Sequence, residues 1–196
     1  SVLVKYADGY PRRLENCIDA PHVLFYKGSQ PLNVQKVVAI VGTRAPTDYG
    51  KERVAALISA LIPLDVLVIS GLAYGIDTLV HRDCVKHGVG TIGVLGHGLN
   101  QIYPSSNRLL AGEMIQRGGL LTEFMHKTKP DRQNFPKRNR IVAGMVDAVV
   151  VVESGEKGGS LITAEIANSY NKDVFAYPGR TTDLGSMGCN HLIRTH

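Results

Sequence analysis

Short apolar runs recur along the chain at intervals, from residue 37 onward, and polar stretches separate them. Continuous runs of this length, rich in Val and Ile, are typical of strands that are buried on both faces of a parallel sheet. The predicted strands cover residues 37–42, 66–70, 91–96, 120–124, 147–153 and 173–179. The run at 147–153, DAVVVVE, has the strongest β-propensity of the chain.

The intervening stretches predict helices. Residues 48–62 place Val54, Leu57, Ile58 and Leu61 on one face, with Thr47 or Asp48 as the N-cap and Pro63 at the end. Further helices are expected at 75–86 and 106–117, from near Arg138 past Ile141, and after the glycine-rich turn that begins at Ser154. Strand and helix therefore alternate, which predicts an α/β, Rossmann-like, doubly wound fold with a mainly parallel sheet of about six strands.

The two ends of the chain have a weaker pattern. Residues 1–36 carry turn formers throughout and are interpreted as an N-terminal arm with one extended segment at Val23–Tyr26. Residues 37–196 are assigned to the Rossmann-like domain. The tail after Gly179 is expected to be loop-like, because TTDLGSMGCN has no clear period.

Composition narrows the class of protein. A length of 196 residues with 44% hydrophobic and 20% charged residues is typical of one globular domain. No apolar run approaches the ~20 residues of a membrane span, and the first residues do not read as a signal peptide. Three cysteines, Cys17, Cys84 and Cys189, are widely spaced and odd in number, which favours a reducing compartment. A cytoplasmic protein without a membrane partner is expected.

Charge is concentrated in one segment, His126–Arg140. It holds six Lys/Arg and one acid, an excess of +5 that equals the formal net charge of the whole chain. Such cation density favours binding to a phosphate backbone, and the aromatic ring of Phe135 in its middle offers a face for an unstacked base. A solvated loop with scattered charges is the alternative interpretation.

Glycine-containing turns follow three predicted strands, at Gly42–Arg44, Ser70–Gly75 and Ser154–Ser160. Each opens a predicted helix, whose N-terminal NH groups can hold an anion at the carboxyl edge of the sheet. Arg44 adds a permanent planar cation. The turn after the first predicted strand reads GTRAPT and not the GxGxxG of dinucleotide-binding folds, and GxxxxGK[ST] does not occur, so neither a dinucleotide site nor a Walker-type NTPase is indicated.

The sequence contains only weak signals for catalytic residues. His81, Cys84 and His87 follow one another at three-residue spacing, which is compatible with a metal site, but a helix with one polar edge is the preferred interpretation. Ser70 lacks a GxSxG elbow. The sequence therefore predicts no catalytic residue, no metal and no cofactor.

With these motifs laid out, the chain resembles the DNA processing protein A family (DprA, also called Smf). The matching stretches include VAIVGTR (38–44), VISGLAYGID (68–77), IYP (102–104), LLTEF (120–124), FPKRNRIVAG (135–144), GGSLITAEIA (158–167), DVFAYPG (173–179) and GCNHLI (188–193). They cover nearly everything from Val38 onward. The lead-in PHVLFYKG (21–28) is also similar.

The resemblance implies a dimeric Rossmann-like protein that binds and protects incoming single-stranded DNA, helps load the RecA recombinase in natural transformation, and is not an enzyme. It implies that Arg44 holds a phosphate, that Phe135 stacks on a base, and that Arg138 and Arg140 line one basic pocket. The full set of DNA-binding residues expected is Thr43, Arg44, Gly71, Arg132, Phe135, Lys137, Arg138, Arg140, Gly159 and Ser160.

A second hypothesis comes from a related Rossmann fold. Nucleotide-processing phosphoribohydrolases carry PGGxGTxxE, and Gly158, Gly159 and Glu165 match part of this fingerprint. Leu161 and Ile162 replace its Gly-Thr pair and the Pro is missing, so this resemblance is partial.

Overall fold

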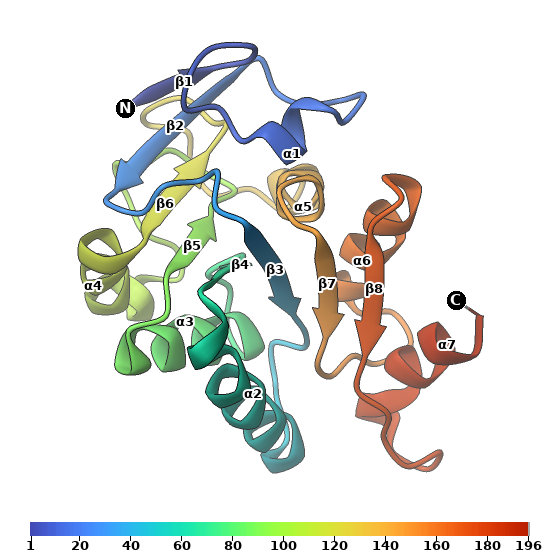
Figure 1. Ribbon diagram of the computed structural model, residues 1–196. Helices are drawn as coiled ribbons and strands as arrows, with labels where there is room; N and C mark the ends of the chain where they lie inside the picture. Colours follow the sequence, from blue (N-terminus) through green and yellow to red (C-terminus); the bar gives the residue numbers. More distant parts are fainter. Residues whose placement is uncertain (196) are drawn as a thin grey trace.

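Eight strands form one sheet in the computed structural model, which describes residues 1–195 (Figure 1). The strands are β1 (Val2–Val4), β2 (Val23–Gly28), β3 (Lys36–Val41), β4 (Val66–Ser70), β5 (Thr91–Val94), β6 (Gly119–Thr122), β7 (Ala148–Val151) and β8 (Asp173–Ala176). Their spatial order is β1-β2-β6-β5-β4-β3-β7-β8. The six strands from β6 to β8 run parallel, and each overlaps one of the six predicted apolar runs.

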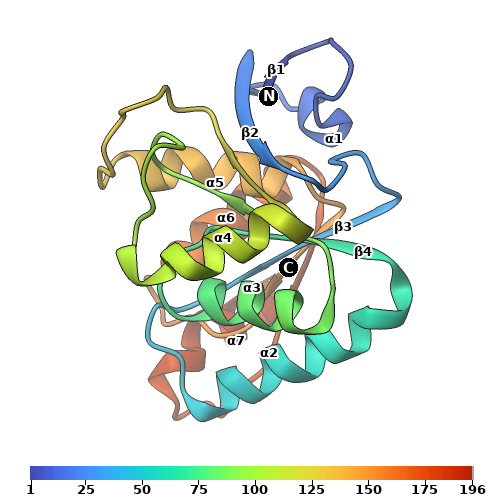
Figure 2. The same ribbon diagram turned by 90° about the vertical axis from the view of Figure 1, so that its left-hand side faces the viewer.

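Helices connect the strands and cover both faces of the sheet, as Figure 2 shows. They are α1 (Arg12–Glu15), α2 (Asp48–Leu61), α3 (Ile76–His87), α4 (Arg108–Arg117), α5 (Asn134–Gly144), α6 (Gly159–Ser169) and α7 (Met187–Thr195). One buried cluster lies under α1, α5 and α6, and two others lie under α2, α3 and α4. The Rossmann-like, doubly wound fold with a mainly parallel sheet is confirmed.

Local signals explain several helix ends. The Thr47 hydroxyl accepts a hydrogen bond from the Gly50 N–H, so Thr47 is the N-cap of α2. Helix α3 ends at Gly88, whose φ of 73° is the left-handed conformation that glycine adopts without strain. Among residues 1–195, no helix is both long and apolar enough to cross a membrane.

Residues 1–36 extend the sheet. Strand β2 pairs with β6 in the antiparallel direction, β1 pairs with β2, and the predicted extended segment Val23–Tyr26 lies within β2. Leu14 of α1 and Leu24 of β2 are fully buried in the core under α5 and α6. The first 36 residues therefore contribute both strands and core side chains.

Two expected boundaries are wrong. Helix α5 begins at Asn134, four residues before the expected start near Arg138. Pro136 is compatible with this first turn because the N–H that proline lacks has no helical partner there. The tail after Gly179 is also not all loop, since α7 packs Cys189 and Leu192 into the core. Long-range burial stabilises a helix that the local sequence pattern does not indicate.

Candidate nucleic-acid interface

A cleft of about 560 Å³ opens at the carboxyl ends of the parallel strands. It lies where the strand order changes direction, because β3 has β4 on one side and β7 on the other. Ligands of doubly wound sheets bind at such switch points. The expected site residues that line the cleft are Thr43, Arg44, Gly71, Arg132, Phe135, Arg138, Gly159 and Ser160. The fold thus brings eight of the ten expected residues to one place.

The loop after β3 is held on two sides. The Thr43 N–H donates to the carbonyl oxygen of Glu153, two residues after β7 (2.7 Å), and the Thr43 carbonyl accepts from the Ile76 N–H at the start of α3 (3.0 Å). The backbone before Arg44 is therefore fixed, while the Arg44 side chain is exposed. Within residues 1–195, no acidic side chain forms an ion pair with Arg44.

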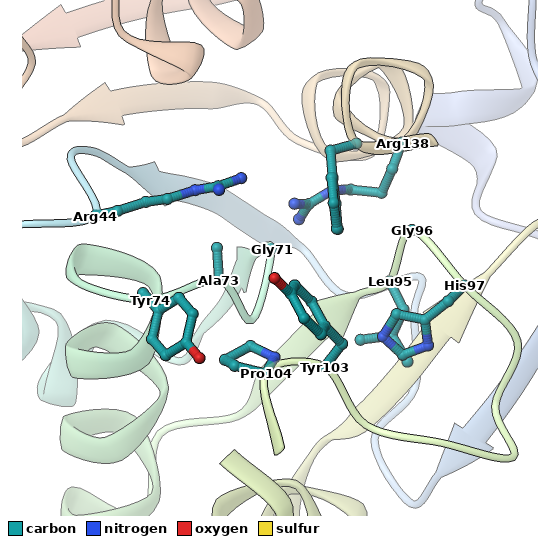
Figure 3. Close-up of a pocket in the computed structure, with 11 residues that line it drawn as sticks. Arg44, Gly71, Ala73, Tyr74, Leu95, Gly96, His97, Tyr103, Pro104 and Arg138 are labelled. Carbon is teal, nitrogen blue, oxygen red and sulfur yellow. The ribbon is translucent and has the colours of Figure 1, made fainter. Parts of the chain in front are cut away.

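Arg44 lies beside a pair of aromatic rings. Its guanidinium carbon is 5.6 Å from the centroid of the Phe135 ring, a cation–π distance. The Phe135 and Tyr103 ring centroids are 5.9 Å apart and the rings are tilted by 31°. Figure 3 shows the Arg44 side chain and the Tyr103 ring extending into the same space. A cation and two π-faces at one cleft suit the phosphates and bases of a nucleic acid.

Arg138 lies deeper than expected. It is only 5% exposed, and its Nη1 donates to the Val94 carbonyl oxygen at the end of β5 (3.0 Å). In Figure 3 its guanidinium points toward Gly71. A Cβ on Gly71 would stand 1.6 Å from Arg138 Nη1, so the glycine makes room for the arginine. Arg138 therefore forms the floor of the cleft.

Asp77 offsets part of the buried charge of Arg138. Burial raises the pKa of the Asp77 carboxyl, and the Arg138 charge opposes this shift. Burial likewise lowers the pKa of Arg138, and Asp77 opposes that shift. The Asp77 carboxylate also accepts a hydrogen bond from the Ala73 N–H (3.2 Å). Arg44, which is exposed while Arg138 is buried, is the more accessible cation beside the rings.

Arg140 does not line the cleft, and the expectation that it shares one pocket with Arg138 is wrong. Its guanidinium donates to the Glu123 carboxylate and to the Asp19 carbonyl oxygen. Residues 138 and 140 are about 200° apart around a helix, so their side chains leave α5 in different directions. Lys137 is exposed and also does not line the cleft. Burial raises the pKa of the Glu123 carboxyl, and the charges of Arg140 and Lys137 oppose this shift.

The N-terminus of α6 forms the opposite wall. Gly159 is exposed, and no atom lies within 4 Å of the position that a Cβ would take there. The Ser160 hydroxyl donates to the Ser154 hydroxyl (2.9 Å), which ties the turn after β7 to the helix. Unpaired N–H groups of a first helical turn favour a bound anion. Arg132, exposed in the segment before α5, adds a further cation at this cleft.

The other candidates lie elsewhere. His81 and Cys84 are buried in α3 and His87 is exposed, and among residues 1–195 no three His, Cys, Asp or Glu side chains gather to hold a metal. Glu165, which matches the working acid of the phosphoribohydrolase fingerprint, is exposed and does not line the cleft.

Sequence reasoning missed Tyr103 and Asp77 as parts of the site. Tyr103 lies in the loop between β5 and α4, and Asp77 lies in the first turn of α3. The signal for Tyr103 was an aromatic residue in a loop after a strand, at the edge where ligands bind. Nothing local marks Asp77, because its partner Arg138 is far away in the sequence.

The family model described as DNA recombination-mediator protein A matches residues 1–196. The chain is 42% identical to Protein Smf of Synechocystis sp. over 188 residues, which are 94% of this chain and 47% of that protein. It is 41% identical to DNA processing protein DprA of Streptococcus pneumoniae over 187 residues, 95% of this chain and 66% of that protein. The chain therefore spans about half to two thirds of the length of these relatives.

Solved structures agree with this likeness. The crystal structure of Streptococcus pneumoniae DprA superposes with a TM-score of 0.94 at 40% identity, covering 99% of this chain and 68% of that chain. DNA processing protein A of Helicobacter pylori, described for its single-stranded DNA binding mode, superposes with a TM-score of 0.89 at 30% identity. That match covers 99% of this chain and 86% of that chain.

Proposed function

Because this chain belongs to the DNA recombination-mediator protein A family, we propose that it binds single-stranded DNA in the cleft at the carboxyl ends of β3 and β7. The observation that carries the proposal is the exposed Arg44, which forms no ion pair with any of residues 1–195, beside the Phe135 and Tyr103 rings. Phosphates lie against Arg44, Arg132 and the N-terminus of α6, and a base lies on the Phe135 ring. A related protein from Helicobacter pylori is described as binding single-stranded DNA.

The same features favour an unpaired strand over a duplex. Paired and stacked bases cannot turn their faces to a ring inside a cleft, whereas bases of a single strand can. The proposed role is binding and not catalysis, since Glu165 of the partial hydrolase fingerprint lies outside the cleft. Incubation with nucleoside monophosphates tests this point, because release of free base would favour the hydrolase.

Fluorescence anisotropy with single-stranded and duplex oligonucleotides over a salt series tests the binding. Arg44→Ala is expected to weaken binding to all sequences and to reduce the slope of log K against log salt by about 0.7, the value for one phosphate contact on a single strand. Arg82→Ala is the matched control, because Arg82 is an exposed arginine of α3 outside the cleft. Phe135→Ala is expected to lose roughly 1–3 kcal/mol, as one base–aromatic stack does.

Equal binding by wild type, Arg44→Ala and Phe135→Ala would contradict the assignment of the cleft. A wild-type protein that prefers duplex would contradict the choice of ligand.

The proposal includes two protein partners, a second copy of this chain and the RecA recombinase. A homodimer is supported by β8, an edge strand of the sheet, whose Phe175 side chain is 57% exposed. Edge strands with exposed apolar side chains favour association. Analytical ultracentrifugation of the wild type and of Phe175→Arg tests the homodimer. The wild type is expected to sediment as a dimer and the variant as a monomer, and a monomeric wild type would contradict the proposal.

The second partner is the RecA recombinase, which the bound protein helps to load while it protects incoming DNA in the cytoplasm. Faster RecA filament growth on single-stranded DNA in the presence of the wild type, and not of Arg44→Ala, is the expected result. An equal rate with and without the wild-type protein would remove RecA as a partner.

A further inference from the structure

Tyr103 offers the more open of the two aromatic rings in the cleft. It is 44% exposed, whereas Phe135 is partly buried. Arg44 lies over the Phe135 ring, and a Cβ on Gly96 would stand only 2.9 Å from Phe135 Cδ1. Phe135 thus already has close neighbours, while much of the Tyr103 ring is accessible to a ligand.

The Tyr103 hydroxyl is also free of the contacts that anchor other tyrosines of this protein. Tyr10 donates to the Pro21 carbonyl oxygen (2.5 Å) and Tyr26 to that of Gln30 (2.7 Å). Within residues 1–195 the Tyr103 hydroxyl has no hydrogen-bond partner. A tyrosine that serves packing alone usually buries its ring and satisfies its hydroxyl. Tyr103 does neither.

The space behind the rings decides how a base is held. The pocket that both rings line, together with Leu95, Gly96, His97 and other residues, encloses only about 10 Å³, room for one water molecule. Figure 3 shows His97 and Leu95 beside the Tyr103 ring. A base therefore cannot enter beyond the rings and must lie on their outer faces. Two neighbouring rings, with centroids 5.9 Å apart, provide two such faces.

We propose that Tyr103 is a second base-stacking residue of the cleft, so that two consecutive bases of a single strand lie on Tyr103 and Phe135. The inference rests on the proposed single-strand binding and deepens it. Stacking on a ring needs no hydrogen-bond pattern of the base, so the pair of rings accepts any sequence. The Tyr103 hydroxyl is not required.

Substitutions at position 103 separate stacking from packing. Tyr103→Ala and Tyr103→Leu are each expected to weaken single-strand binding about 5- to 150-fold, the range for loss of one base–aromatic stack. Leucine keeps apolar volume but has no aromatic face. Tyr103→Phe is expected to bind like wild type. Tyr6→Ala is the matched control, because Tyr6 is 78% exposed, between β1 and α1, and does not line the cleft.

Fluorescence from a probe at single base positions then tests whether two bases are stacked. The shortest oligothymidylate that binds is prepared with 2-aminopurine, whose emission falls on stacking, at one position at a time. Wild type is expected to quench two adjacent positions, Tyr103→Leu to lose one of them, and Phe135→Ala to lose the other. If Tyr103→Leu binds and quenches like wild type, the inference is wrong. If Tyr103→Leu and Phe135→Ala lose the same positions, Tyr103 only positions Phe135 and the inference is also wrong.

Other results would contradict the proposal of single-strand binding itself. If Arg44→Ala and Phe135→Ala weaken binding but Tyr103→Leu does not, only the role of Tyr103 is lost. If the wild type does not bind single strands, both proposals are lost together.

Discussion

Gly71→Ala is expected to destabilise the free protein because it forces Arg138 to move. An added Cβ would stand 1.6 Å from Arg138 Nη1, 2.5 Å from Cζ and 2.6 Å from Nη2. These distances are far inside van der Waals contact, and Arg138 is only 5% exposed. The guanidinium cannot shift without losing its hydrogen bond to the Val94 carbonyl oxygen.

The magnitude follows from that bond. A hydrogen bond to a charged group contributes about 1.5–3 kcal/mol. Replacing Gly by Ala stabilises by about 0.4–1 kcal/mol, since it restricts the unfolded chain. The net loss is then about 0.5–2.5 kcal/mol, which lowers Tm by about 1–10 °C for a domain of this size.

Thermal unfolding followed by circular dichroism measures the change. Gly159→Ala is the matched control, because no atom lies within 4 Å of its added Cβ, and its Tm is expected to equal or slightly exceed that of the wild type. In an Arg138→Met background, Gly71→Ala is expected to lose much of its effect, since the guanidinium is gone. Equal Tm values for Gly71→Ala and Gly159→Ala would refute the reasoning.

Three further predictions test the rest of the site. Arg140→Ala should lower the free energy of unfolding in urea by about 1.5–3 kcal/mol, because it removes the hydrogen bond to the Glu123 carboxylate. It should leave the salt dependence of DNA binding unchanged, and a reduced slope would show that Arg140 belongs to the interface. Burial lowers the His81 pKa to about 3, so between pH 6.5 and about 3 only the unfolded chain gains this proton and the free energy of unfolding falls as the pH decreases. His81→Gln should flatten that fall by about 1.4 kcal/mol per pH unit, and equal slopes would contradict it. Gly159→Ala should weaken binding to single-stranded DNA without lowering the Tm. If this variant binds with wild-type affinity, Gly159 is not part of the interface.

Much of the fold could be predicted because its signals are local. Apolar runs indicated all six parallel strands, since a strand buried on both faces needs consecutive apolar residues. Turn residues such as Pro63, which follows α2, marked helix ends. The antiparallel β1 was not foreseen, because Val2–Val4 is short and partly exposed, and its place depends on the free edge of β2.

The candidate site divides in the same way. The sequence alone determined that cations, glycines and Phe135 follow the strands, and parallel strands bring their carboxyl ends to one edge. Only the tertiary structure decided the direction of each side chain. Because α5 begins at Asn134 and turns about 100° per residue, Arg138 enters the floor beside Gly71 while Arg140 turns to Glu123. Tyr103 reaches Phe135 across 32 residues of sequence, a contact that depends on packing between separate elements and not on any local pattern.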